Sequence, residues 1–307
     1  MRKLHTPCRS GQKRRGTNPH RVRLWPRGRG MLRKQPRRRK FPRAALMLLL
    51  LIVVGCTFAA WLTPYEVSVM DGQAISLAPC LAHPLGTDSL GRDLLAMILY
   101  GGRLSLYIGL LSALLSSLLA LVYGAISGLA PGALDALLMR FCELLMSLPS
   151  LILVLFLQAV WGKPTPTSIA VVLALTSWMT LAKLVRSEVR RIRESDYILS
   201  AKIMGADFTY LLQKHLLPNL ISPAMFMVVS SFGQAIIAET TLSFLGLGLP
   251  VSQVSWGSLL SLSKNALLSN QLWMILLPGL VLVTTLVCIT ELGEYARARN
   301  NRLQSNL

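Results

Sequence analysis

Residues 196–219 read DYILSAKIMGADFTYLLQKHLLPN and separate two apolar stretches of the chain. The preceding stretch covers about residues 168–184, and the following one covers about residues 221–245. Both come close to the roughly 20 mostly apolar residues that a helix needs to cross a bilayer. Residues 196–219 are therefore expected to form a polar loop at one face of a membrane.

Local signals inside this loop predict two short helices set at an angle to each other. Ser195 or Asp196 can cap the start of the first helix by accepting a hydrogen bond from a free backbone N–H. Gly205 permits a sharp break after that helix, and Pro218 is expected to end the second. A partner that grips such a loop can move both flanking spans together. The alternative is an ordinary amphipathic loop that lies on the membrane surface.

The composition is that of a polytopic membrane protein. The chain has 307 residues, of which 53% are hydrophobic and only 15% are charged. A soluble domain of this size carries more charge. We therefore predict an all-α fold with about six transmembrane helices. The expected spans cover about residues 44–62, 104–126, 134–160, 168–184, 221–245 and 272–292.

The formal net charge of +19 comes mostly from one end of the chain. Residues 1–43 hold 17 lysine or arginine residues and no aspartate or glutamate. We interpret this segment as a disordered, basic, cytoplasmic arm. Binding of nucleic acid or of anionic lipid by the arm is the alternative.

Basic residues also predict the orientation of the spans. The loop at about 186–219 and the tail at 298–307 are basic, and six spans place both on the same side as the N-terminal arm. The positive-inside rule makes that side the cytoplasm. We therefore expect a transmembrane domain over residues 44–297 of a cytoplasmic membrane protein, with both termini inside. The cysteines are scattered without metal-binding spacing, so no metal site is expected.

The polar loop resembles the EAA loop of ABC importer permeases, which docks in a groove of the ATPase subunit. Gly205 matches the glycine of that loop, and residues 215–219, HLLPN, match its closing motif. Leu199 and Ser200 replace the usual glutamate and first alanine, which changes the polar contacts expected at the ATPase. The resemblance implies docking roles for Tyr197, Ala201, Met204, Gly205, Ala206, His215 and Pro218.

A second motif, HPLGTDSLGRD at residues 83–93, resembles a signature of the dipeptide, oligopeptide and nickel branch of these permeases. Its glycines predict a turn, and Asp88 or Ser89 can cap the helix that follows. A metal pair of His83 and Asp88 is the less favoured interpretation. The residues expected to have a structural role are Gly86, Asp88, Gly91, Arg92 and Asp93.

Further along, Asp135 and Arg140 match the D-x-x-x-M-R pattern of the same branch. Together with Glu143, they are expected to form local ion pairs at the cytoplasmic end of the third span. Glycines spaced four apart nearby allow helices to approach closely.

Glu239 is expected to lie in or near the hydrocarbon, in the fifth span. Because an ionisable group there is costly, it usually faces a cavity or a partner. We consider it a candidate for lining or gating a pathway, together with Phe244 and Trp256. The alternatives are a hydrogen-bonded structural carboxylate at a subunit interface and an interfacial anchor role for Trp256.

The resemblance implies one permease subunit of an ATP-driven importer for di- or oligopeptides. The implied partners are a second, similar permease, two ATPase subunits, an extracytoplasmic solute-binding protein and membrane lipid. The chain has no G-x-x-x-x-G-K-[ST] phosphate loop and no catalytic constellation, so ATP and magnesium are expected in the ATPase partner and no cofactor in this chain. Nickel or a metal chelate is the alternative cargo. A membrane-anchored nucleic-acid-binding protein and a stand-alone secondary transporter are the alternatives from other classes.

Overall fold

The structure is a computed structural model in which the described residues are almost entirely helical. It describes residues 41–67, 69–207, 210, 214, 217–250, 252–264 and 271–305. Within these ranges the only β pairing is an isolated bridge between Thr87 and Asp93, so the predicted all-α fold class is confirmed. The basic arm lies outside the described residues except for its last three positions.

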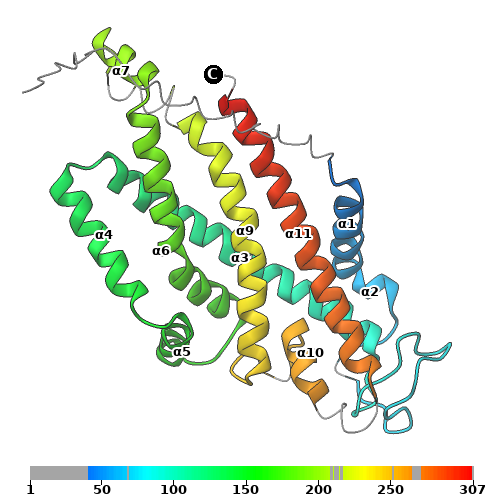
Figure 1. Cartoon of the computed structure of the whole chain (residues 1–307). Helices are drawn as coiled ribbons and strands as arrows, with labels where there is room; N and C mark the ends of the chain where they lie inside the picture. The colour runs from blue at the N-terminus through cyan, green and yellow to red at the C-terminus, as the bar shows by residue number, and fades with distance from the viewer. Residues whose placement is uncertain are drawn as a thin grey trace, which may run out of the picture. The chain divides into compact units, whose positions relative to one another are not determined.

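The helices follow one another along the chain with short connections (Figure 1). Their bounds are α1 (Arg43–Thr57), α2 (Ala59–Leu62), α3 (Leu94–Leu129), α4 (Gly132–Met146), α5 (Ser150–Trp161), α6 (Pro166–Arg193), α7 (Asp196–Ile203), α9 (Leu217–Phe244), α10 (Trp256–Leu262) and α11 (Trp273–Ser305).

Four of these helices, α3, α6, α9 and α11, are each long and apolar enough to cross a membrane. The consecutive helices α4 and α5 pass the same test as a pair and make a fifth candidate span. The short apolar helix α1 lies where the first span is expected. It ends at Thr57, and the chain resumes as α2 after Phe58, although nothing in the local sequence explains this break.

The expected third span is not one continuous helix. The predicted helix over residues 134–160 is interrupted after Met146, and the axes of α4 and α5 meet at an angle of 87°. Pro149 precedes α5 and explains the break, because proline lacks a backbone donor and disfavours a helical conformation at the preceding residue. The pair is therefore a broken span or a re-entrant loop.

Small residues let α3 lie against α6 and α9. In Figure 1, α3 runs obliquely behind both of these helices. A Cβ atom at Gly124 would lie 2.5 Å from the backbone oxygen of Ala182, and one at Gly109 would lie 2.8 Å from Ile236. Glycine is required at these crossings because any side chain would push the helices apart.

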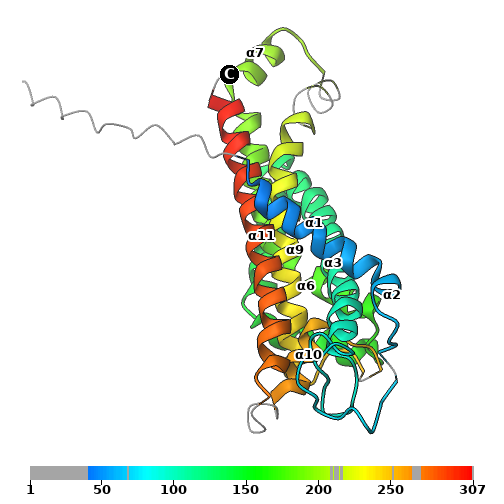
Figure 2. The same ribbon diagram turned by 90° about the vertical axis from the view of Figure 1, so that its right-hand side faces the viewer.

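The two ends of the helices carry different structures. Helix α7 lies at the same end as the C-terminal part of α11, whereas α10 and the loop of residues 63–93 lie at the other end (Figures 1 and 2). The start of α1 also lies near the α7 end of α11, since the rings of Phe41 and Tyr295 pack edge to face with centroids 5.1 Å apart.

Candidate functional site

Helix α7 forms the core of the predicted docking loop. Its inward face carries Ile198 and Ala201, which are buried in one apolar cluster with Val185, Val189 and Ile192 of α6 and with Leu220 and Met227 of α9. Its far end is exposed. Ile203 is 87% exposed and Met204 is 80% exposed, so two large apolar side chains are presented to the outside of this chain.

The end of α7 has the geometry of a glycine-terminated helix. Gly205 has a φ of +84°, and the backbone N–H of Ala206 donates to the carbonyl of Ala201 at 3.0 Å. This bond and the left-handed residue before it form a Schellman motif, which satisfies a free carbonyl at the helix end. The sharp break predicted at Gly205 is confirmed.

The proposed docking residues fall into two groups. Ala201 is buried and Ala206 half-buried, and both contact the α6 and α9 cluster. Met204 and Gly205 are exposed at the tip. The first pair therefore holds α7 in place and the second pair is free to meet a partner.

Three features of the loop differ from expectation or lie outside the described residues. Pro218 is the second residue of α9, where a missing backbone donor costs nothing, and the helix that it is expected to end lies outside the described residues. His215 and the expected second short helix lie outside the described residues. Tyr197 belongs to α7, but its side chain is not described. The docking roles of these residues stay predictions.

Asp135 is buried and joins α4 to α6. Its carboxylate pairs with Arg186 and Arg190 and accepts a hydrogen bond from Ser127 at 2.6 Å. The predicted local ion pairing is confirmed for Arg140 and Glu143, whereas Asp135 pairs with arginines of α6. Arg140 and Glu143 pair at 3.2 Å on the exposed side of α4, because the two side chains are three residues apart on the same helix.

In the loop of residues 63–93, the motif at 83–93 is a network of buried charges. Asp88 accepts from the Arg92 backbone at 2.8 Å, and its other carboxylate oxygen lies 2.7 Å from the Arg92 guanidinium. Asp93 lies 2.9 Å from Nδ1 of His83. Each carboxylate is thereby paired with a different side chain, and His83 and Asp88 do not form the metal pair that was considered.

The cap of α3 is Asp93, and the prediction of Asp88 or Ser89 is wrong. Asp93 accepts a hydrogen bond from the backbone of Ala96 at 2.8 Å. Helix α3 therefore begins at Leu94, ten residues before the expected span. Asp88 instead lies in the turn before α3, where its carboxylate accepts a hydrogen bond from the Arg92 side chain.

Two glycines make this turn possible. Gly86 and Gly91 have φ values of +81° and +75°. A Cβ atom at Gly91 would lie 1.9 Å from the carbonyl oxygen of Asp71. Both the backbone conformation and the close approach exclude other residues.

Glu239 is fully buried inside this chain. It accepts hydrogen bonds from Ser105 of α3 at 3.2 Å and from Ser243 of its own helix at 2.8 Å. Ser105 in turn accepts from the backbone N–H of Trp256 at 3.1 Å. This hydrogen-bonded group, which we call the Glu239 node, links α3, α9 and α10. The node gives the carboxylate internal partners, and its role in a pathway or gate stays a prediction.

The other two pathway candidates have contrasting environments. Trp256 is fully buried, and its indole N–H donates to the carbonyl of Ile98 at 3.0 Å. It is therefore part of the packing between α3 and α10 and not an exposed anchor. Phe244 is partly exposed at the end of α9, with the ammonium of Lys264 4.1 Å from its ring centroid.

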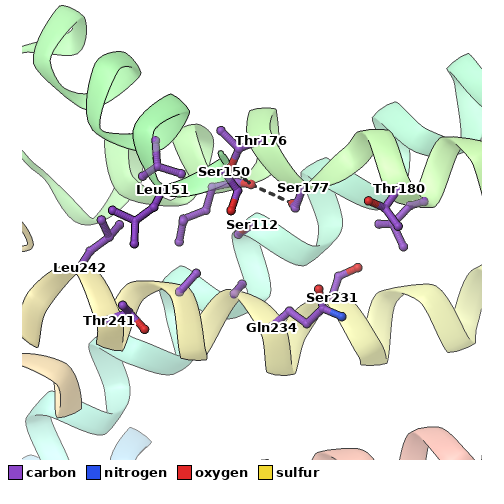
Figure 3. Close-up of a pocket in the computed structure, with 15 residues that line it drawn as sticks. Ser112, Ser150, Leu151, Thr176, Ser177, Thr180, Ser231, Gln234, Thr241 and Leu242 are labelled. Atoms are coloured by element: carbon purple, nitrogen blue, oxygen red, sulfur yellow. Dashed lines mark hydrogen bonds between the residues drawn. The ribbon is translucent and has the colours of Figure 1, made fainter. Parts of the chain in front are cut away.

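Sequence reasoning missed a cavity of ≈ 460 Å³ between α3, α5, α6 and α9. Figure 3 shows hydroxyl and amide side chains from these helices converging on it. A signal for it exists in the sequence, since these neutral polar residues interrupt otherwise apolar spans. They are Ser112, Ser150, Thr176, Ser177, Thr180, Ser231, Gln234 and Thr241.

The chain is similar to one family of transport proteins over most of its length. Residues 120–299 match the family described as "Binding-protein-dependent transport system inner membrane component". The dipeptide transport system permease protein DppC of Bacillus subtilis (strain 168) is 33% identical over 258 residues, which are 84% of this chain and 80% of that protein. A putative peptide transport system permease protein of Brucella suis biovar 1 (strain 1330) is 36% identical over 270 residues, which are 86% of this chain and 88% of that protein.

These similarities agree with the helical spans and with the motifs in the loop of residues 63–93 and in α7. The family match covers more than half of the chain, and the relatives are matched over 80% or more of their own length. The predicted ABC type I importer permease architecture and a multi-pass membrane location are therefore confirmed. The chain belongs to the family of binding-protein-dependent transport system inner membrane components and is an ABC importer permease of the peptide family.

Proposed function

We propose that this chain is a non-catalytic permease subunit of an ATP-driven importer for di- or oligopeptides. It pairs with a second permease, takes its driving force from two ATPase subunits that hold ATP and magnesium, and receives cargo from an extracytoplasmic binding protein. Both termini and α7 lie in the cytoplasm. The observation that carries this proposal is the division of α7 into a buried face and an exposed apolar tip.

The buried face makes α7 a mechanical link. Ile198 and Ala201 are packed against α6 and α9 in one cluster, and close-packed apolar side chains transmit displacement because they have no free space to absorb it. A force on α7 therefore acts on both helices. Asp135 extends the effect, since its pairing with Arg186 and Arg190 ties α4 to the same end of α6.

The exposed tip supplies the surface that an ATPase would grip. An exposed side chain as large as that of Ile203 or Met204 gains free energy when a partner covers it, on the order of 1.5–3 kcal/mol for full burial. Two such side chains next to each other at the end of a held helix are well suited to a groove in a partner.

Peptide cargo is supported by the relatives, which are named as dipeptide or peptide permeases. Nickel or a metal chelate remains the alternative cargo for the same machine. The binding protein that co-purifies with the assembly can be screened with peptides and with nickel, which separates the two.

The test combines partner identification with a charge placed on the tip. The assembly is solubilised gently from its native membrane, its subunits are identified by mass spectrometry, and peptide uptake is measured after reconstitution. We expect Met204→Asp to lose the ATPase and ATP-dependent uptake while the chain stays in the membrane. Leu81→Asp is the matched control, because Leu81 is a fully exposed apolar residue in the loop of residues 63–93. Retention of the ATPase by the Met204 variant would contradict the docking assignment.

A further inference from the structure

The cavity between α3, α5, α6 and α9 is lined without any ionisable side chain. Its polar residues are hydroxyls and one amide, and its remaining wall is aliphatic. At ≈ 460 Å³ it lies within the range of sites that take small ligands. Such a lining can form hydrogen bonds but offers no counter-ion to a charged group, so it favours neutral polar ligands over charged ones.

Most hydroxyls at the cavity are already occupied by their own helices. Thr176 and Ser177 donate to backbone carbonyls one turn earlier in α6, at 3.1 Å and 2.8 Å. Ser231 does the same in α9 at 2.8 Å. These groups need no ligand, although their oxygens can still accept a hydrogen bond.

Ser112 is the one buried hydroxyl of the lining that has no such bond among the described residues. Its side chain is 1% exposed, lines the cavity, and has no hydrogen-bond partner among the described residues. A buried hydroxyl without a partner costs about 1–3 kcal/mol, which a ligand in the cavity would recover. Gln234 faces the same space from α9 and offers an exposed amide, which can donate and accept (Figure 3).

We propose that this cavity binds the main chain of a peptide through its neutral amide groups. Ser112 and Gln234 provide hydrogen-bonding groups, and the aliphatic wall accommodates uncharged side chains. An amide both donates and accepts, as a hydroxyl and a carboxamide do. Recognition of the main chain does not depend on which uncharged side chains the peptide carries. This inference rests on the proposed function, because it takes peptide as the cargo.

The experiment measures occupation of the cavity directly, in the complete reconstituted assembly. Thr180, an exposed residue of the lining, is replaced in a Thr180→Cys variant and labelled with N-ethylmaleimide. The probes are trialanine and the same tripeptide methylated at both amide nitrogens, which removes the N–H donors and keeps the charge. Thr290→Cys on α11 is the labelling control, because Thr290 is exposed and does not line the cavity.

We expect trialanine to protect Cys at position 180 and not at position 290, and the methylated tripeptide to protect less well. Adding Ser112→Ala should raise the trialanine concentration for half-protection about fivefold, the effect of one lost hydrogen bond. The same change should have a smaller effect with the methylated tripeptide, whose carbonyls can still accept from Ser112 but whose amide nitrogens can no longer donate to it. The protection that remains also verifies that the variant is folded. Ser116→Ala is the matched control, since Ser116 is buried one turn along α3 and donates to the carbonyl of Ala113.

Equal half-protection in the Ser112 and Ser116 variants, or no protection at position 180, would overturn this inference. Failure of the proposed function has a different signature. The wild-type assembly would then show no ATP-dependent uptake of trialanine, whatever the labelling results.

Discussion

The loop of residues 63–93 and helix α7 lie at opposite ends of the same helices and are held by different forces (Figure 1). The loop relies on buried charges in fixed geometry, as in the pair of Asp88 and Arg92. Helix α7 relies on the apolar contacts of Ile198 and Ala201. Paired charges and hydrogen bonds weaken as soon as their geometry changes, whereas apolar contacts are non-directional, so a packed helix can shift together with the helices that it contacts. We infer that the loop end is rigid and that the α7 end is the one that can move.

The largest effect should come from removing the glycine that ends α7. Gly205→Pro is expected to abolish association with the ATPase while leaving the chain inserted in the membrane. Proline fixes φ near −65°, and Gly205 has a φ of +84°. Co-purification of the ATPase measures this. Normal recovery of the ATPase with the mutant would show that α7 is not the docking element.

Substitutions in the loop of residues 63–93 should lower the stability of the chain and leave its association with the ATPase unchanged. Asp88→Ala leaves the buried Arg92 guanidinium without its carboxylate, which we expect to cost about 3–5 kcal/mol. Thermal unfolding in detergent measures the loss. The exposed neighbour Ser89→Ala is the matched control, and an equal effect of both changes would mean that the loop is not rigidified by its charges.

Glu239 tests whether the buried node between the two ends has a role beyond packing. Glu239→Ala removes the acceptor for Ser105 and Ser243 and should cost about 2 kcal/mol of stability. Glu239→Gln keeps an acceptor oxygen, so we expect smaller loss of stability and normal transport. Loss of transport by a stable Gln variant would instead establish Glu239 as a gating residue.

The smallest effect is expected from the N-terminal arm. Deletion of residues 2–30 should preserve insertion and peptide uptake, because the proposed machinery lies in the helices from α1 onward. Uptake by reconstituted vesicles measures this. Loss of uptake with normal insertion would show that the arm takes part in transport and would favour its alternative interpretation as a binding segment.

Much of the architecture could be predicted from the sequence because its signals are local. An apolar stretch of sufficient length predicts a span wherever it occurs. Likewise, a glycine after a short helical segment predicts the end of α7, since Gly205 needs no distant residue to adopt its conformation. Pro149 is also a local signal for a break. The apolar composition on both sides of it nevertheless predicts one continuous span.

The sites depend on contacts between residues far apart in the chain. Asp135 and Arg186 are 51 residues apart, and Ser105 and Glu239 are 134 residues apart. The sequence patterns around these residues do not predict which helix faces pack against each other. The sequence by itself determined the membrane-spanning helical fold and the glycine-terminated helix α7, because apolar length and turn chemistry act locally. Only the tertiary structure decided the charge partners, the buried setting of Glu239 and the neutral cavity around Ser112, because these depend on how helix faces pack.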